Sequence, residues 1–384
     1  MTKLEQLIEE LCPNGVEYRK LSEVTTIERG RRVVKEQLSH DSGYPVFQNS
    51  LTPMGFHTDS NYPAETSYVI GAGAAGEIGY CKEDFWAADD CFPIVCGDSV
   101  INRYVYHFLL WQQPVLLSKV RKASIPRLSR SVIENIMIPV PPLPVQSEIV
   151  RILDNFTELT AELTAELTAR KKQYEYYRDT LLKSQQEMKT VKLGSVCEVY
   201  DGTHQTPKYT NSGVPFVSVE NIDDLYGTTK YISAEDYAKY KIKPQIGDVF
   251  MTRITAGIIG KCAVVDRNDD LAYYVSLALL RPDPSVLDSK YLKYYLESGW
   301  GRKELAKRIL WDATPTKINK DDIGKVYIAL PSLDVQQRLV HVLDNFDAMC
   351  TDLNVGLPAE IEARQKQYEY YRDKLLTFKE LIAN

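Results

Sequence analysis

The fold of this chain is decided by a stretch that occurs twice: Lys172-Gln173-Tyr174-Glu175-Tyr176-Tyr177-Arg178-Asp179, which returns letter for letter at residues 366–373. A shorter stretch, Leu153-Asp154-Asn155-Phe156, returns in the same way at residues 343–346. Matching segments in the same order are typical of an internal repeat. The chain is therefore predicted to hold two copies of one unit.

The similarity continues upstream of both stretches. A Val-Gln pair follows a proline-rich segment at residues 145–146 and again at residues 335–336. Residues 136–141 resemble residues 326–331, which extends the match to the end of the region before each helix. These boundaries predict four segments: a globular region at 1–140, a helical region at 141–187, a second globular region at 188–330 and a second helical region at 331–384.

Both helical regions carry one apolar stripe with steps of three and four residues, the spacing of an amphipathic helix. Gly356 and Pro358 interrupt the second stripe, where we expect a kink or restart. A lone helix of this kind leaves its stripe in water, so the two helices are predicted to pack as an antiparallel coiled coil. The residues expected to face the other helix or a partner are Phe156, Leu159, Leu163, Leu167, Tyr174, Tyr177, Phe346, Leu353, Ile361, Tyr368 and Tyr371.

The globular regions mix short strands with helices. Runs at 214–219 and 261–265 are β-rich, and residues 102–110 and 289–296 form amphipathic patterns, the latter with Asp288 as an expected N-cap. The predicted class is α+β: two tandem, pseudo-repeated α/β globular domains, each followed by a long helix.

Composition excludes several kinds of protein. No apolar run is long enough to cross a bilayer, and the N-terminus is not patterned as a signal peptide, so a cytoplasmic protein is expected. The seven cysteines include no C-x-x-C pair, and no cysteine or histidine spacing suggests a metal site. The net charge of −6 argues against DNA binding by bulk charge, although local basic patches remain compatible with it.

Two motifs that resemble catalytic or cofactor sites are better explained by structure. Gly71-Ala72-Gly73-Ala74-Ala75-Gly76 matches a dinucleotide motif, but a strand-like run follows where a helix should open, which favours a hairpin tip. Pro282-Asp283 with Asp288-Ser289-Lys290 resembles a nuclease motif, yet the spacing is too short for a hairpin that gathers metal ligands. The sequence also lacks an N-P-P-Y or D-P-P-Y methylase stretch and a phosphate loop for ATP. No catalytic or metal-binding residue is therefore predicted.

A doubled basic segment is the main candidate for DNA binding. Residues 119–130 hold five basic residues and no acid, and residues 307–320 are their counterpart. Guanidinium and ammonium groups bind phosphates, whereas Asn, Gln and Arg can pair with base edges. A solvated charged face is the alternative, but recurrence in both copies favours DNA. The candidate DNA-binding residues are Arg29, Arg31, Arg32, Lys35, Gln48, Asn49, Lys119, Arg121, Lys122, Arg127, Arg130, His204, Gln205, Lys208, Asn221, Arg253, Lys307, Arg308, Lys317 and Asn319.

Taken together, these motifs resemble the specificity subunits (HsdS) of type I restriction–modification systems. Residues 11–18 look like their N-termini, residues 201–207 like the start of a second target-recognition domain, and residues 170–179 like a conserved-region helix. The glycine-rich hairpin departs from the family because it lacks the basic residue often seen there.

The resemblance implies a non-catalytic chain with two target-recognition domains that read double-stranded DNA with a bipartite site. It implies two methyltransferase (M) subunits as partners, and restriction (R) subunits in the full enzyme. S-adenosylmethionine would be bound by M and ATP with Mg by R, with no cofactor on this chain. Because the two domains differ in sequence, the expected target is asymmetric.

Two other functions remain open at this point. A catalytic nuclease or methylase with two DNA-reading modules would act without partners, and the missing motifs oppose it. A coiled-coil scaffold that never meets DNA would explain the helices but not the doubled basic segment. One further feature is the perfect tetrapeptide period of residues 160–167, Thr-Ala-Glu-Leu twice, which we interpret as a ruler between the two domains.

Overall fold

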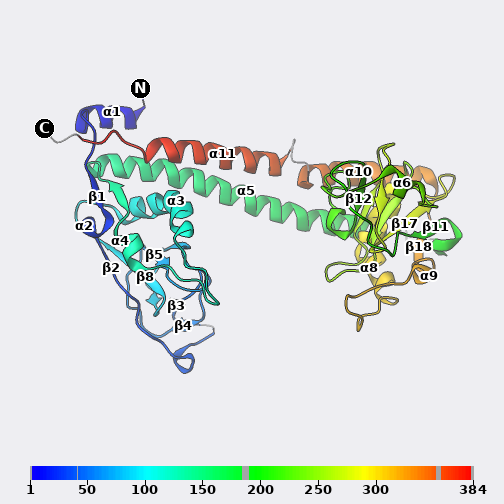
Figure 1. Ribbon diagram of the computed structural model, residues 1–384, viewed down its shortest axis with the longest axis horizontal. Helices are drawn as coiled ribbons and strands as arrows, with labels where there is room; N and C mark the ends of the chain where they lie inside the picture. Colours follow the sequence, from blue (N-terminus) through cyan, green and yellow to red (C-terminus); the bar gives the residue numbers. More distant parts are fainter. Residues whose placement is uncertain (1, 41, 184–189, 352–355, 382–384) are drawn as a thin grey trace. The chain divides into compact units, whose positions relative to one another are not determined.

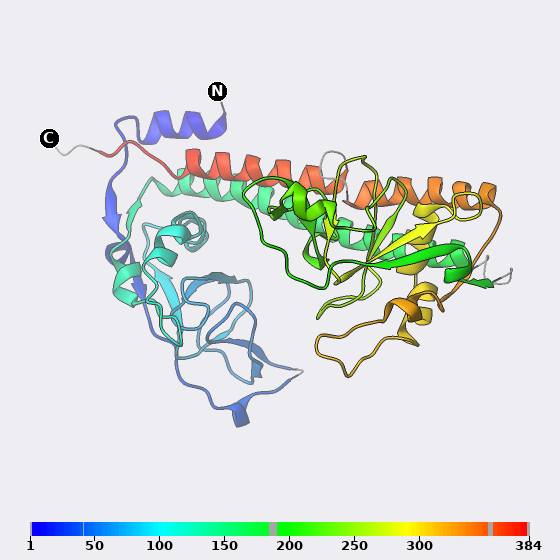
Figure 2. The ribbon, with the colours of Figure 1, turned by 45° about the vertical axis from the view of Figure 1, so that its right-hand side comes forward.

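The computed structural model describes residues 2–40, 42–183, 190–351 and 356–381. The chain forms two compact units (Figures 1 and 2), one made of Met1–Thr164 with Glu360–Asn384 and the other of Ala165–Ala359. Each unit mixes helices with small sheets, as expected for the α+β class. Among the described residues, no helix is long and apolar enough to cross a membrane.

The first unit builds its globular part on three small sheets. A four-stranded antiparallel sheet has the order β2-β8-β5-β6, a three-stranded sheet has the order β4-β3-β7, and β1 pairs with β9. The elements up to the long helix are α1 (Lys3–Leu11), β1 (Tyr18–Lys20), α2 (Leu21–Val24), β2 (Thr25–Ile27), η1 (Lys35–Gln37), β3 (Tyr44–Phe47), β4 (Phe56–His57), β5 (Thr66–Ile70), β6 (Ile78–Cys81), β7 (Trp86–Ala87), β8 (Cys91–Cys96), α3 (Asn102–Ser118), α4 (Arg130–Glu134) and β9 (Met137–Pro139).

The second unit repeats this plan with the same strand orders, β11-β17-β14-β15, β13-β12-β16 and β10-β18. Its elements are β10 (Thr190–Lys192), η2 (Leu193–Ser195), β11 (Cys197–Asp201), β12 (Val214–Val217), η3 (Val219–Asn221), β13 (Tyr231–Ile232), α6 (Ala234–Ala238), β14 (Val249–Thr252), β15 (Cys262–Val264), β16 (Ala272–Tyr273), β17 (Leu277–Pro282), α7 (Ser289–Glu297), α8 (Gly299–Ala306), α9 (Lys320–Ile323) and β18 (Tyr327–Ala329). The repeat inferred from sequence is thus also a repeat of topology.

The long helices follow their apolar stripes. Helix α5 (Leu143–Lys183) is continuous over 41 residues, and its path leaves the first unit at Thr164 and enters the second at Ala165. The second helical region consists of α10 (Leu333–Thr351) and α11 (Leu357–Leu375), so the predicted interruption is confirmed. Gly356 has a φ of +99°, a conformation that favours glycine. Leu353 lies outside the described residues.

The repeated aromatic residues stack in matching pairs within each unit. In the first unit the rings of Phe156 and Tyr371 stack with centroids 5.4 Å apart. In the second unit Tyr177 and Phe346 stack with centroids 5.7 Å apart. Phe156 and Phe346 end the two Leu-Asp-Asn-Phe copies, and the two tyrosines occupy the same place in the eight-residue repeat. Each unit therefore joins a residue from one copy to a residue from the other.

The repeated Val-Gln pair has a structural explanation. Gln336 is fully buried, and its side-chain carbonyl accepts a hydrogen bond from the backbone nitrogen of Asp288 at 2.8 Å. Its amide nitrogen donates to the backbone oxygens of Val286 (2.9 Å) and Pro331 (2.8 Å). In the first unit Gln146 makes the equivalent bonds to the residues before α3 and to Pro141. The glutamine thus ties a long helix to the globular part of its unit.

Replacement of Gln336 by leucine is expected to destabilise the second unit strongly. The part-buried N–H of Asp288 and carbonyl of Val286 and the buried carbonyl of Pro331 lose their partner, and an unsatisfied buried group costs roughly 1–3 kcal/mol. The loss of about 3 kcal/mol corresponds to a melting point lower by about 6–12 °C for a unit of this size. Differential scanning calorimetry measures the shift, with Gln337→Leu on the exposed side of the same helix as control. Equal melting points for the two variants would contradict this account.

The two copies differ where the helix after the large sheet ends. In the first unit α3 continues for 17 residues, past the predicted end at 110, because Leu116 is buried in the same core as Phe108. In the second unit this helix breaks at Ser298 into α7 and α8. The predicted N-cap of α7 is confirmed, since the Asp288 side chain accepts bonds from two backbone nitrogens of the first turn.

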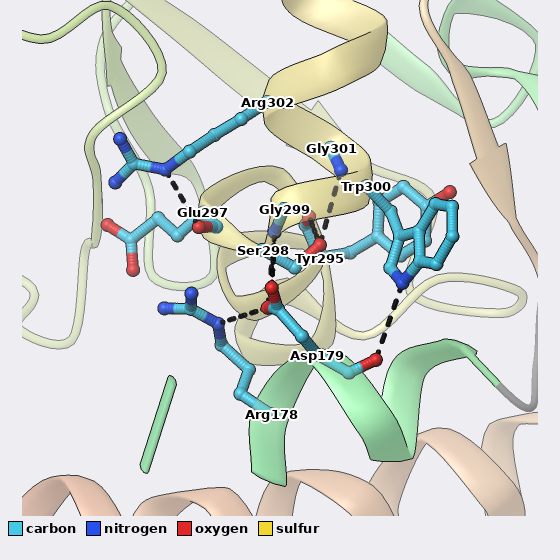
Figure 3. A network of polar contacts seen from close by, with 9 residues as sticks. All are labelled: Arg178, Asp179, Tyr295, Glu297, Ser298, Gly299, Trp300, Gly301 and Arg302. Carbon is cyan, nitrogen blue, oxygen red and sulfur yellow. Dashed lines mark hydrogen bonds and ion pairs between the residues drawn. The ribbon is translucent and has the colours of Figure 1, made fainter. Parts of the chain in front are cut away.

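Figure 3 shows how α5 reaches the start of α8. The carboxylate of Asp179 accepts the backbone N–H of Gly299 at 3.1 and 3.2 Å, and the indole of Trp300 donates to the Asp179 backbone oxygen at 3.3 Å. Arg178 pairs with the same carboxylate at 3.2 Å. A negative charge at a helix N-terminus is stabilising, so the break in the helix gives the second unit an anchor on α5.

Candidate nucleic-acid interface

The basic segment of the first unit folds into a narrow loop. The backbones of Arg121 and Arg127 bond to each other in both directions, at 2.8 and 3.2 Å, which closes the loop between them. The backbone N–H of Leu128 donates to Gly71 at 2.8 Å, and Gly73 donates to Pro126 at 3.1 Å. The loop is therefore fixed against the glycine-rich hairpin between β5 and β6.

The counterpart in the second unit is built in the same way. Leu310 pairs with Lys317, and Lys317 forms a bridge with Ile254 on the segment after β14. The backbone N–H of Ile318 donates to Arg253 at 2.9 Å, and Thr255 donates to Thr316 at 3.0 Å. Two segments with unlike sequences thus adopt one construction, a closed loop held by the tip of a neighbouring hairpin.

The glycine-rich motif is a hairpin tip, as predicted. Strands β5 and β6 pair antiparallel on either side of it, and no helix opens there. Gly73 has a φ of +81°, and a Cβ at this position would meet the backbone oxygen of Asn49 at 2.8 Å. The backbone N–H of Ala74 donates to that same oxygen at 2.9 Å. The close approach explains the glycine and places Asn49, a predicted DNA contact, beside the basic loop.

Most of the predicted basic contacts of the first unit are exposed. Lys119 is exposed at the end of α3, Arg121, Lys122 and Arg127 lie on the closed loop, and Arg130 pairs with Glu134 at 3.0 Å just after it. A second group follows β2. There Arg29 donates to the backbone oxygen of Asp89 at 3.1 Å, and Arg31, Arg32 and Lys35 are exposed. Two further predicted contacts follow β3: Gln48 is half-buried and Asn49 is exposed.

In the second unit several predicted contacts have partners within the protein. Arg308 bonds Glu304, and Lys307 pairs with the same carboxylate. The side-chain oxygen of Asn221 accepts the backbone N–H of Ser218 at 3.2 Å, which makes it a turn residue in this structure. The side chain of Asn319 donates to Asp322 at 3.2 Å, Lys317 is half-buried, and three predicted contacts are exposed on the loop after β11: His204, Gln205 and Lys208.

Arg253 differs from the other predicted contacts because it is buried. Its guanidinium forms an ion pair with Asp201, and its Nε donates to the backbone oxygen of Ile318 at 3.1 Å. In this position the side chain joins β11, the segment after β14 and the end of the basic loop. A base contact by Arg253 stays a prediction, and the geometry instead gives it a positioning role for the loops around it.

Sequence reasoning missed an apolar residue in each basic loop. Ile125 is 54% exposed and Trp311 is 64% exposed, although both are large hydrophobic residues. Apolar and aromatic side chains can contact the methyl group of thymine or stack on bases. An exposed apolar residue amid basic residues is the signal that could have identified them.

The described side chains offer little for catalysis. Among the described residues, no group of three or more His, Cys, Asp or Glu side chains could hold a metal ion. Burial raises the pKa of the Cys96 and Cys197 thiols to about 12, so neither is a thiolate near neutral pH. In the nuclease-like motif, Asp288 caps α7, and the carboxylate of Asp283 accepts bonds from Ser285.

Comparison with known proteins gives a consistent result over almost the whole chain. The family model described as type I restriction modification DNA specificity domain matches residues 13–170 and 185–363. A putative type I restriction enzyme specificity subunit of Haemophilus influenzae is 32% identical over 98% of each chain. The specificity subunit of type I restriction enzyme EcoR124I/EcoR124II of Escherichia coli is 30% identical over 98% of this chain and 97% of its own.

Two solved structures have a similar fold. The S subunit of a type I restriction–modification system from M. genitalium covers 98% of this chain and 99% of its own, with a TM-score of 0.59 and 16% identity. A chain from a study of complex assembly in the type I system covers 96% of this chain and 98% of its own, with a TM-score of 0.58 and 20% identity.

Proposed function

The chain belongs to the type I restriction–modification DNA specificity family, and we propose that it directs a methyltransferase to an asymmetric, two-part DNA sequence. The observation that carries the proposal is the closed basic loop that both units build in the same way. The first loop presents exposed cations for phosphates, the second contributes the half-buried Lys317, and each presents an apolar group for bases, at Ile125 or Trp311. Because the two loops differ in sequence, each unit reads a different half-site.

The chemistry belongs to partner subunits in this proposal. Two M subunits bind this chain and use S-adenosylmethionine, and R subunits join in the full enzyme with ATP and Mg. The named relatives are specificity subunits, which supports a role without a catalytic site of its own. The closed loops favour this role over a scaffold that never meets DNA.

The purified chain is expected to transfer no methyl group, whereas the chain mixed with its M subunits methylates adenine at one bipartite sequence. The reason is that the sequence supplies two readers but no methylase stretch. Single-molecule sequencing of DNA treated with the chain, with M alone and with both measures the difference. Methylation by the chain alone, or the same sites from M alone, would contradict the proposal.

A repeated exposed face suggests where two copies of M bind. Packing explains why Tyr174 and Tyr177 of the eight-residue repeat recur, because both contact the core or a facing ring. It does not explain Tyr176 and its equivalent Tyr370, which are 67% and 63% exposed. If two copies of the same partner bind this chain, each copy needs the same contact residue, and an exposed tyrosine at the same place in both repeats meets this requirement. In the second unit, Tyr176 also borders a hollow of about 380 Å³ that Trp300 helps to line.

Substitution of these tyrosines is expected to remove M subunits one at a time. Tyr176→Ala and Tyr370→Ala should each weaken one of two M sites by about 30-fold, since central interface tyrosines are worth roughly 2 kcal/mol or more. Native mass spectrometry at limiting M then finds one M per chain in each single variant and none in the double variant. Tyr327→Ala, at a tyrosine that is 41% exposed on β18, is the matched control. Two bound M subunits in the double variant would exclude this face.

The antiparallel coiled coil is part of the same proposal. The stacked pairs Phe156–Tyr371 and Tyr177–Phe346 support it, because each pairs the start of one helical copy with the end of the other. Aromatic pairs of this kind contribute roughly 0.5–1.5 kcal/mol beyond their burial. The coiled coil would fix the spacing between the two readers.

A further inference from the structure

The second unit contains a cavity of about 620 Å³ beside its basic loop. Its walls come from four parts of the unit: the end of β11 with the loop that follows it, the α6 segment, Tyr273 of β16, and the start of α9. Binding pockets for nucleotide-sized ligands typically measure roughly 300–1,000 Å³, so this space can take such a group.

Two segments predicted to bind DNA meet at this cavity. Gln205 and Lys208 come from the loop after β11, and Lys320 follows the basic loop at the start of α9. The buried Arg253 links these walls, because its guanidinium pairs with Asp201 on one side and donates to the Ile318 backbone oxygen on the other. The cavity is therefore a built feature rather than a gap between loose loops.

The lining is cationic. It holds four lysines and two aspartates, which leaves a net charge of +2. One of the aspartates, Asp201, already pairs with Arg253, and the other, Asp236, pairs with Lys239 at 2.6 Å. Lys208 is exposed, and Lys320, half-buried on a separate wall, lies 4.0 Å from the exposed carboxylate of Asp321, so each lysine can approach an anion from a different side.

Tyr273 supplies a buried donor to the same cavity. The side chain is 1% exposed, and among the described residues its hydroxyl has no hydrogen-bond partner. Burial raises the pKa of this hydroxyl, so it stays protonated and able to donate. A buried hydroxyl without a partner is unfavourable, which points to a bound group that completes it.

The first unit lacks these features at the equivalent place. In the first unit the backbone N–H of Arg31 donates to the backbone oxygen of Ala87, and in the second unit the backbone N–H of Thr203 donates to the backbone oxygen of Tyr273. Ala87 therefore occupies the position that is equivalent to Tyr273. Residues 58–65, between β4 and β5, contain no helix equivalent to α6. The tyrosine and the helical wall of this cavity are thus features of the second unit among the described residues, and they bear on what that unit alone recognises.

We propose that this cavity receives one backbone phosphate of the DNA half-site read by the second unit, held by Lys208 and Lys320 and bonded by the Tyr273 hydroxyl. The proposal rests on the proposed function. It adds a phosphate contact that holds the second unit on its half-site, through a tyrosine that has no equivalent among the described residues of the first unit. The two lysines supply charge, and the hydroxyl donates to a phosphate oxygen. Such a contact fixes the register of the unit on the duplex, because phosphate contacts position a protein and base contacts specify the sequence.

The test uses the chain assembled with its M subunits and DNA that carries the full methylation site. Lys208→Ala and Lys320→Ala should each weaken binding by about 3–10-fold and lower the slope of log K against log salt by about 0.9, the value for one phosphate contact. Tyr273→Phe should weaken binding by about 3–10-fold without changing the slope. Lys192→Ala, at an exposed lysine on β10 that does not line the cavity, should leave both values unchanged.

Modified DNA identifies the source of the phosphate. A methylphosphonate, which removes the charge of one phosphate, is placed at each position of the second half-site in turn. It should weaken DNA binding by the wild-type complex at one position only. At that position it should not weaken DNA binding by the Lys208→Ala complex any further. Inorganic phosphate and deoxyadenosine monophosphate should not displace the DNA at millimolar concentration. Three results would overturn the proposal. The methylphosphonate could weaken binding by the Lys208→Ala complex as much as by the wild type at every position, the lysine variants could leave the salt slope unchanged, or free phosphate could displace the DNA. A wild-type complex without sequence-specific binding would instead refute the proposed function.

Discussion

Exchange of residues 21–136 for the equivalent segment of a relative with another specificity is expected to replace one half-site of the methylated sequence and leave the other unchanged. The reason lies in β1 and β9, which pair antiparallel at the two ends of this segment, Lys20 opposite Met137. The chain enters and leaves the globular part through one small sheet, so the exchanged segment is a closed piece of structure. The anchors that recur in both units, Gln146 and the long helices, stay in place.

The reciprocal exchange is the control. Residues 193–326 lie between β10 and β18, which pair in the same way, and their exchange should change only the other half-site. Methylome sequencing of cells that carry each hybrid reads both half-sites at once. The two-reader model fails if either hybrid changes both half-sites together, or if both hybrids retain the original sequence although they bind M.

The features that the sequence predicts well are those that repeat or that follow a period. The two copies of the eight-residue stretch predicted two long helices, and the interruption at Gly356 and Pro358 separates α10 from α11. Asp288 is correctly predicted as an N-cap because its position before an amphipathic run is a local signal. Each of these predictions depends on residues that are close together in the chain.

The features that escaped prediction depend on contacts between distant segments. Many strands of both units have only two or three residues, too few for an alternating pattern, so their pairing depends on partners far along the chain. The burial of Arg253 follows from Asp201, 52 residues away, and nothing local distinguishes it from an exposed arginine. The cavity lined by Tyr273 has the same origin, because its walls come from four separate segments.

One added Thr-Ala-Glu-Leu unit within residues 160–167 is expected to lengthen the DNA spacer by one base pair and to leave both half-sites unchanged. The run lies in the middle of α5, where the helix passes from the first unit to the second. Its threonines bond back along the helix, Thr160 to Phe156 at 2.8 Å and Thr164 to Thr160 at 2.7 Å, so each unit repeats the same local structure. Leu159, Leu163 and Leu167 are half-buried along one face.

The size of the step follows from helix geometry. Four residues add about 6 Å of length and about 40° of rotation to an α-helix. A DNA base pair adds about 3.4 Å along its axis and about 35° of rotation. The rotation thus matches one base pair, and the length allows one to two. The chain already tolerates such a difference, since 18 positions separate Phe156 from Tyr174 whereas 22 separate Phe346 from Tyr368.

A single inserted alanine is the discriminating control, because it preserves helix propensity but not phase. One residue turns all later side chains by about 100°, which moves the half-buried leucines off their face and separates the stacked aromatic pairs. The alanine variant should therefore lose M binding and methylation, whereas the four-residue variant retains both. Methylome sequencing of the two strains gives the outcome. An unchanged spacer in the four-residue variant would exclude a ruler, and altered half-sites in that variant would place base recognition within the helix.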